Sequence, residues 1–478
     1  MARKVLQTTL AFIGLVVGAG FASGQEVLQY FVSYGTGGIV AAAISAILLA
    51  LAGVAILQLG SYYHAMEHTD VFDSITRPWI SRLVDAFVCL VLFCLGFVMI
   101  AGAGSNLHQQ FGLPNWVGAV VVTVLVILTG MLDVNKVMTI IGSITPFIIV
   151  FTVAASLHAF ISANPDWEAL SNVALSVPSP LPNWPVAVLN YVGLALILAL
   201  SMALVMGGDQ LNARIAGLGG LFGGATFGLL LFIASCAIFV SVDSVKDADM
   251  PMLAMVNDIS PVLGTIMAIV IFGMIYNTAI GMFYALGKRA AGIRSSWYKP
   301  ALIGTTLAGF ACSFLGFKTL VGKLYPIIGW VGIVIIAMIV IRWVLDRKQI
   351  QKETARRVRI RDLVTDKLHR RRRFTARDHK RLEKELAASN LADHTLHGDM
   401  VDEVASELDA AGEPVDARVV ATTQAEVEAI DELIDEHGEE AVLDDTGTLL
   451  PTHEGVVEDA VEEAVARGED SPEHSHHP

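Results

Sequence analysis

The chain has few cysteines and few charged residues for its length of 478 residues. Its four cysteines all lie within apolar runs, which excludes a disulfide framework of the kind that small secreted domains use. Residues 1–345 contain only 14 Lys and Arg against 13 Asp and Glu, a net charge of +1. With 54% hydrophobic residues and a mean hydropathy of +0.60, the composition excludes an ordinary soluble domain and indicates membrane helices.

What the chain does contain is long apolar runs, most of them about the 20 residues that cross a bilayer. Arg3 and Lys4 precede the first run, which we predict to be a transmembrane helix because it is too long for a signal peptide. The ten predicted spans are residues 5–33, 39–60, 82–107, 115–133, 138–162, 186–207, 214–241, 260–287, 300–319 and 324–345.

Positive charge is concentrated in alternate loops between these spans, whereas the long loop 163–185 has no Lys or Arg. The positive-inside rule therefore predicts a multi-pass protein of the plasma membrane with both termini in the cytoplasm. The basic residues of the predicted inner loops are Arg77, Arg82, Lys136, Arg214, Lys288, Arg289, Arg294 and Lys299. The exceptions, on the predicted outer side, are Lys246, Lys318 and Lys323.

Three regions follow from these patterns: a transmembrane domain at 1–345, a basic juxtamembrane segment at 346–384 and an acidic tail at 385–478. Residues 346–478 hold 18 basic and 33 acidic residues, a net charge of −15. We expect the basic segment to contact anionic lipids of the bilayer. The acidic tail is poor in aromatics, and we predict it to be disordered, apart from short amphipathic helices near 424–437.

Within the first predicted span, residues 16–26 read VVGAGFASGQE. Gly14, Gly18 and Ala22 are spaced by four, which suits close packing against a neighbouring helix. That interpretation does not account for the polar residues at 23, 25 and 26. The other interpretation is a helix that unwinds inside the bilayer and exposes backbone carbonyl and N–H groups as a binding site.

The stretch VGAGFASGQE, the glycine-rich YGTGG at 34–38 and the ten-span layout resemble the YkvI-type bacterial membrane proteins. Those proteins belong to the amino acid–polyamine–organocation transporter superfamily, and more distantly they look like sodium-coupled amino-acid transporters with the LeuT fold. The resemblance covers about residues 1–345. It implies an all-α membrane protein whose ten transmembrane helices form two inverted five-helix repeats with helices one and six broken, followed here by the disordered cytoplasmic tail.

The resemblance also implies site residues. N–H groups at the start of the second half-helix would hold a substrate carboxylate, and carbonyls at the end of the first would hold a sodium ion. Phe21 stands where sodium-coupled relatives have an asparagine, so a second sodium site is not expected. The implied substrate-binding residues are Gly18, Ala19, Gly20, Ser23 and Ser201. The implied cation-binding residues are Gly14, Val17, Gly273, Asn277 and Thr278.

Two of these assignments have alternatives. A break in helix six around Ala199–Met202 is expected only from the inverted repeat, and Ser201 could instead bond to its own helix. Glu26 is a charged residue within a span, so we consider both a proton-coupling role and a structural role at the start of a half-helix. Because the hydroxyl expected beside Asn277 comes only from Thr278, one residue out of register, the coupling ion could be sodium or a proton.

The predicted function is secondary active transport, by symport, of a small solute such as an amino acid or related zwitterion. No nucleotide-binding loop or cofactor fingerprint is present, so we expect no cofactor beyond a sodium ion, and no nucleic-acid partner. One alternative is a membrane sensor that signals through its tail. Another is a metalloprotease using the H-x-x-E-H pattern of His64, Glu67 and His68, but the primary prediction is that the protein is not an enzyme.

Overall fold

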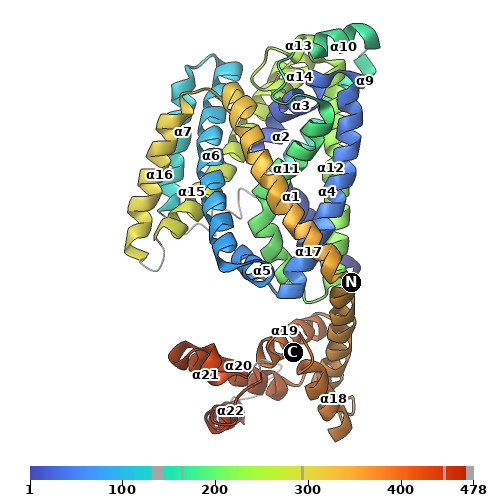
Figure 1. Ribbon diagram of the computed structural model, residues 1–478, viewed down its shortest axis with the longest axis vertical. Coiled ribbons are helices and arrows are strands. Elements are labelled where there is room, and N and C mark those ends of the chain that lie inside the picture. Colours follow the sequence, from blue (N-terminus) through green and yellow to red (C-terminus); the bar gives the residue numbers. More distant parts are fainter. Residues whose placement is uncertain (132–144, 163–165, 292–294, 445–447, 470–478) are drawn as a thin grey trace, which may run out of the picture. The chain divides into compact units, whose positions relative to one another are not determined.

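The computed structural model describes residues 1–131, 145–162, 166–291, 295–444 and 448–469, and the regular secondary structure in these ranges is helical (Figure 1). The all-α prediction is therefore confirmed. The helices up to residue 368 are α1 (Ala2–Val16), α2 (Ala19–Ser23), α3 (Gln25–Tyr30), α4 (Thr36–Tyr63), α5 (His68–Ile75), α6 (Pro78–Phe111), α7 (Asn115–Gly130), α9 (Thr145–Ser162), α10 (Trp167–Leu175), α11 (Trp184–Gly208), α12 (Ala213–Val240), α13 (Val242–Val245), α14 (Pro251–Ile259), α15 (Pro261–Ala291), α16 (Tyr298–Ser313) and α17 (Phe317–Leu368).

The chain divides into two compact units. The first, which we call the bundle, comprises residues 1–60, 65–207 and 215–344. The second, the C-terminal unit, begins at Leu345, one residue from the predicted boundary, and also includes residues 61–64 and 208–214. It contains the last part of α17 and the helices α18 (Ala376–Leu386), α19 (Asp393–Ala410), α20 (Ala417–His437), α21 (Glu439–Val442) and α22 (Glu454–Glu469).

Six helices of the described residues are long and apolar enough to cross a membrane, namely α4, α6, α11, α12, α15 and α17. The shorter apolar helices α7 and α9 add to them. Every predicted span overlaps a helix, and the first overlaps α1, α2 and α3. The end of the predicted span 115–133 and the beginning of 138–162 lie outside the described residues.

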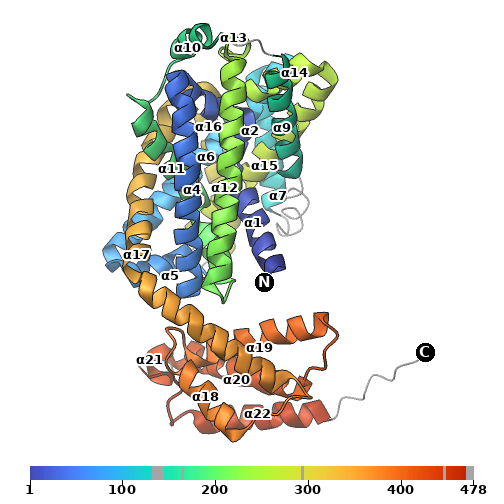
Figure 2. The same cartoon turned by 90° about the vertical axis from the view of Figure 1, so that its right-hand side faces the viewer.

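The long helices of the bundle run side by side, with α10 and α13 at one end and α5 and the N-terminus at the other (Figures 1 and 2). Within it, α6, α7, α15 and α16 pack against one another. The short helices α2 and α3 lie among the long ones, and every residue of both is buried.

Close helix packing depends on small residues of α12, at Gly220, Gly224 and Gly228. A Cβ atom on Gly224 would lie 2.7 Å from the Leu49 carbonyl oxygen of α4, and one on Gly228 would lie 2.5 Å from Ala46. The spacing of four residues places all three on one face, as in other membrane helix pairs. By contrast, a Cβ on Gly14 or Gly18 would meet no other part of the described chain within 4 Å, so for the residues that the structure describes the packing interpretation of those two glycines is wrong.

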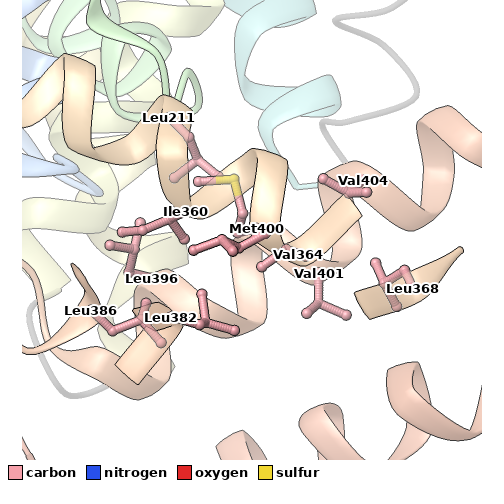
Figure 3. Packing of buried hydrophobic residues seen from close by; sticks show 11 residues of the cluster. Leu211, Ile360, Val364, Leu368, Leu382, Leu386, Leu396, Met400, Val401 and Val404 are labelled. Carbon is pink, nitrogen blue, oxygen red and sulfur yellow. The ribbon is translucent and has the colours of Figure 1, made fainter. Parts of the chain in front are cut away.

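The C-terminal unit has an apolar core, and the predicted disorder of its acidic part is wrong for the described residues. The core side chains come from three helices and from one residue of the 208–214 segment, and they point toward one another (Figure 3). They are Ile360, Leu363, Val364 and Leu368 of α17, Leu382 and Leu386 of α18, Leu396, Met400, Val401 and Val404 of α19, and Leu211. A second cluster joins α20, α22 and the segment between them.

The physical reason for the error is spacing. Residues 360, 364 and 368 follow one another at intervals of four, and residues 396, 400 and 404 do the same, so each set forms an apolar stripe on an otherwise charged helix. The average composition of residues 346–478 does not reveal these apolar stripes, because charged residues outnumber them. The stripes are nevertheless sufficient for one helix to pack on another. The predicted helices near 424–437 coincide with α20.

Candidate functional site

The first predicted span is broken where the sequence indicated. Helix α1 ends at Val16, and Val17 (φ −70°, ψ 90°) and Gly18 (φ −95°, ψ 174°) are extended. The last bond of α1 runs from the Val17 N–H to the Ile13 carbonyl at 2.9 Å, and the Gly18 carbonyl accepts from the Ala22 N–H at 3.1 Å. The end of one helix and the start of another leave backbone carbonyl and N–H groups without helical partners. The predicted break of helix one is thus confirmed, although it is confined to two residues, with 19–23 helical again.

A second irregularity follows at Gly24, whose backbone is left-handed (φ 79°, ψ −6°). A side chain there would be strained and would also meet the Met252 backbone nitrogen of α14 at 2.9 Å. The Ser23 hydroxyl donates to the Gly20 carbonyl at 2.7 Å and accepts from the Gln25 N–H at 3.1 Å. Ser23 therefore fastens the bend between α2 and α3.

The Glu26 carboxyl group lies directly over Gly20, in the space that a Cβ atom at that position would occupy. Glu26 is 7% exposed, and its carboxyl makes no hydrogen bond or ion pair with any described residue. A carboxylate withdrawn from water without a cationic partner is costly, so the group must be protonated or must meet a bound cation. Gly20 thus serves to make room for this carboxyl.

Gln25 is fully buried, and neither its Oε1 nor its Nε2 has a hydrogen-bond partner among the described residues. Asn190 of α11, equally buried, is different: its Oδ1 accepts from the Tyr30 hydroxyl at 3.1 Å and its Nδ2 donates to the Pro326 carbonyl at 2.9 Å. An unsatisfied buried donor or acceptor costs about 1 to 3 kcal/mol. The Gln25 side chain has two such unsatisfied atoms and lies beside an interrupted helix. We interpret it as a position where a bound molecule would supply the missing hydrogen-bond partners.

Helix α15 packs against α2 and contributes the second group of predicted site residues. The Asn277 Oδ1 is buried and has no partner in the described chain. The Thr278 hydroxyl donates to the Met274 carbonyl of its own helix at 3.0 Å, and Gly273 lies within the continuous helix. Of the three predicted residues on α15, Asn277 thus has the oxygen that is left for a cation.

Ser201 lies on a helix that is unbroken, because α11 is continuous from Trp184 to Gly208; the predicted break at Ala199–Met202 is wrong. The Ser201 hydroxyl lies 3.1 Å from the His68 Nδ1 atom, and the Arg289 Nη2 group lies 2.9 Å from the same nitrogen. Arg289 also forms an ion pair with Asp85. The structure therefore places Ser201 in a polar cluster with α5, α6 and α15, where its hydroxyl is engaged.

This cluster was not anticipated from the sequence. His68 is 1% exposed, and burial, followed by the charge of Arg289, lowers its pKa to about 4. Since a guanidinium can only donate, the His68 Nδ1 is the unprotonated acceptor nitrogen of a neutral ring. The available signal was the opposite charges of Asp85 and Arg289 at the ends of two otherwise nearly uncharged spans.

The H-x-x-E-H pattern does not lie on one helix. Helix α4 ends at Tyr63, His64 has a positive φ of 49°, and Glu67 is the N-cap residue of α5. His64 and His68 therefore do not have the i, i+4 helical relation that the metalloprotease pattern requires. Among the residues that the structure describes, no group of three His, Cys, Asp or Glu side chains is arranged to hold a metal ion.

Comparison with known proteins gives distant likenesses. No family model matches the chain. The chain is 23% identical over 333 residues to the uncharacterized membrane protein YkvI of Bacillus subtilis, covering 69% of this chain and 93% of that protein. It is 24% identical over 346 residues to the uncharacterized protein YyaD of the same organism, covering 72% and 98%.

Among solved structures, the chain is similar to the manganese transporter of Eremococcus coleocola, with 12% identity, a TM-score of 0.38, and coverage of 89% of this chain and 94% of that one. It is also similar to Mhp1 in an inward-facing conformation, with 13% identity, a TM-score of 0.35, and coverage of 98% and 95%.

The apolar helices, together with the membrane-protein relative, identify the chain as a multi-pass membrane protein.

Proposed function

We propose that the protein is a secondary active transporter of a small solute, an amino acid or a related zwitterion, that works by alternating access. The observation that carries the proposal is the fully buried Gln25 amide, neither atom of which has a partner among the described residues, directly after the interrupted α1–α2 segment. Membrane transporters place their substrate sites at such discontinuous helices.

A zwitterion suits the chemistry of this segment better than an anion does. The N–H groups of Ala19 and Gly20 begin α2, where the helix dipole and free donors favour a carboxylate, and the Gln25 Nε2 is a further donor. The Glu26 carboxyl over Gly20 and the Gln25 Oε1 favour an ammonium group. One ligand that carries both charges would satisfy both sets.

The other predicted substrate residues take different roles in this proposal. The extended Gly18 gives the ligand access to the backbone, since no described residue other than its chain neighbours comes within 4 Å of where its Cβ would be. Ser23 holds the bend through its two backbone bonds. Ser201 belongs to the His68 cluster and is left out of the substrate site.

For the coupling ion, we propose sodium held by the carbonyls of Gly14 and Val17 and by the Asn277 Oδ1. The first two lie at the free end of α1, and the third is the unpartnered oxygen of the helix that packs on α2. Gly273 could add its carbonyl through the lone pair that the helix does not use, while the Thr278 hydroxyl already bonds to Met274. Proton coupling through Glu26 is the second candidate, favoured because no described residue gives that buried carboxyl a cationic partner.

We further propose that the bundle has two inverted five-helix repeats like the LeuT fold, and that the chain groups with the YkvI-type proteins of the amino acid–polyamine–organocation superfamily. The likeness across 93% of the YkvI chain supports this grouping. From the distribution of Lys and Arg, both termini face the cytoplasm of the plasma membrane, and the basic start of the C-terminal unit contacts anionic lipids. Cysteines introduced at Asn172 and Lys299 should be labelled from outside and inside respectively.

The test is a thermal-stability screen of the purified protein with each of the twenty L-amino acids, with sodium or potassium chloride. Binding to the folded state raises the unfolding temperature by mass action. We expect at least one amino acid to stabilise the wild type and not Gln25→Leu. Stabilisation that requires sodium and is lost in Asn277→Ala supports sodium coupling, whereas stabilisation that is independent of sodium and lost in Glu26→Gln supports the proton.

Uptake by the reconstituted protein separates a transporter from a sensor. A transporter should accumulate the stabilising amino acid in liposomes when the coupling gradient is applied. Stabilisation without uptake, in vesicles with correctly inserted protein, would favour the sensor and contradict the proposal.

A further inference from the structure

A cavity of about 270 Å³ is lined by residues of α3, of the segment that precedes α11 and of the first turns of α17. Its polar lining residues are Gln29, Ser179, Lys318, Thr319 and Lys323. Two of these, Lys318 and Lys323, are among the three lysines that depart from the predicted positive-inside distribution. Because basic residues are disfavoured on the translocated side, their presence at one cavity calls for a specific cause.

The cavity carries unbalanced positive charge. No Asp or Glu is among its lining residues, and the first turn of α17 has no acidic residue to offset the positive end of the helix dipole. The Lys318 Nζ donates to the Lys246 carbonyl at 3.3 Å, and the nearby Asp243 carboxylate is already paired with the Lys246 Nζ at 3.0 Å. The Lys323 ammonium has no ion pair or hydrogen bond with any described residue and faces solvent.

The cavity also offers an acceptor that no protein group uses. Gln29 is 5% exposed, its Nε2 donates to the Lys318 carbonyl at 3.4 Å, and its buried Oε1 has no partner within the described ranges. Gly322 of α17 faces this oxygen, so that even a Cβ there would lie 3.4 Å from it. An acceptor oxygen beside two lysines does not suit an inorganic anion, which would leave the oxygen unsatisfied.

We propose that this cavity is a second, outer binding site for an amino-acid zwitterion, in which Lys323 and Lys318 hold the carboxylate and the Gln29 Oε1 accepts from the ammonium. The substrate class rests on the proposed function; the site itself is separate from Gln25 and Glu26. The volume lies near the lower limit of small-molecule sites, which restricts the ligand to small amino acids.

The experiment is amine acetylation of the purified full-length protein, followed residue by residue by mass spectrometry. Each L-amino acid is tested singly, and acetate and ethylamine serve as probes that carry one charge each. At about four times its Kd, a bound amino acid should slow acetylation of Lys323 about fivefold. Lys299, an exposed lysine at the start of α16, is the internal control and should not change.

Three variants divide the possible outcomes. Gln29→Met should lose the protection of Lys323, and Gln25→Leu, which lacks the inner amide, should keep it. If acetate slows the acetylation of Lys323 as much as the amino acid does, the ligand need not carry an ammonium group, and the zwitterion assignment is wrong. If amino acids stabilise the protein through Gln25 but none protects Lys323, the outer site is wrong and the proposed function stands. If Lys323 is protected but Gln25→Leu melts like the wild type with every amino acid, the outer site stands and the proposed function fails. The third variant, Lys323→Gln, should reduce the uptake of any transported amino acid at low concentration only.

Discussion

Gln25 in the bundle and Arg357 in the C-terminal unit are both buried, at 0% and 2% exposure. The polar atoms of Arg357 are hydrogen-bonded, whereas those of Gln25 have no partner among the described residues. Arg357 donates from Nε to Glu353 at 3.1 Å, from Nη1 to the Ser61 carbonyl at 2.7 Å and from Nη2 to the Tyr62 carbonyl at 2.9 Å. Gln25 has no partner within the described chain. A buried polar side chain whose hydrogen bonds are all made stabilises one conformation of the protein. A buried polar side chain that lacks hydrogen-bond partners is stabilised only when a ligand supplies them.

This contrast assigns different roles to the two regions. The Arg357 guanidinium connects four parts of the C-terminal unit, because it also bonds to the Leu211 carbonyl at 3.3 Å and to the Asn390 Oδ1 at 3.1 Å. It therefore joins α17, the residues that precede α19 and both short segments of this unit. We interpret it as a structural centre, and the Gln25 region as a place where a ligand completes the structure.

The largest expected effect is that of removing the satisfied charge. Arg357→Met should destabilise the C-terminal unit by about 3 to 5 kcal/mol, because the Glu353 carboxylate loses one of its two arginine partners and the carbonyls of Ser61, Tyr62 and Leu211 each lose a charged donor. Hydrogen exchange of the full-length protein, followed over α18 and α19, measures the loss as a fall in protection.

Arg359 provides the matched control on the same helix. Its side chain is 45% exposed and pairs with Glu385 at 2.9 Å, so Arg359→Met should cost less than about 1 kcal/mol. Equal losses in the two variants would contradict the structural role that we assign to Arg357.

A smaller effect of opposite sign is expected at the unsatisfied amide. Gln25→Leu should raise the stability of the ligand-free bundle by about 1 to 3 kcal/mol, since leucine removes two unpaired polar atoms at similar volume. Asn190→Leu, at an amide whose two atoms are both bonded, should lower it. Thermal unfolding of the two purified variants compares the signs directly. Destabilisation by Gln25→Leu would indicate that its amide has a partner in the free protein.

The sequence was informative about the bundle because lipid permits few solutions. Ten apolar runs can only be helices there, and the glycines at 18, 20 and 24 beside Gln25 and Glu26 could not continue one without cost. The break at Val17–Gly18 was therefore predictable. That Glu26 lies over Gly20 was not, since it depends on the left-handed turn at Gly24 between them.

The sequence was misleading where side chains far apart in the chain must meet. Ser201 looked like a residue of the break, and only the structure brings it to His68 and Arg289. The C-terminal unit looked disordered because net charge and aromatic content average over its apolar stripes. Its stability depends on stripes from different helices facing one another, as Ile360, Leu382 and Met400 do, and composition carries no record of that arrangement.

The smallest expected effect concerns the pH dependence of the C-terminal unit, through His397. Burial, followed by the charge of Lys367, lowers the pKa of His397 to about 4, and its Nε2 lies 3.4 Å from the Lys367 Nζ. Between about pH 6.5 and pH 4 the unfolded chain binds a proton that the folded unit does not, so stability falls as the pH falls through this window. From pH 7 to pH 5 the loss from this group should be about 1 to 2 kcal/mol.

His397→Gln should remove that part of the acid sensitivity, while the carboxylates that titrate in the same range contribute equally to both proteins and cancel in the difference. Hydrogen-exchange protection factors over α19 at the two pH values give the comparison, because they divide out the pH dependence of the intrinsic exchange rate. His437→Gln is the control, since the His437 side chain is 50% exposed and is not among the groups that lower the pKa of His397. If acid lowers the stability of the wild type and of His397→Gln equally, the pKa of His397 is not lowered in the folded unit. The C-terminal unit would then resemble the bundle site, because His397 would be a buried polar group whose partner in the folded protein is not the one that we assign.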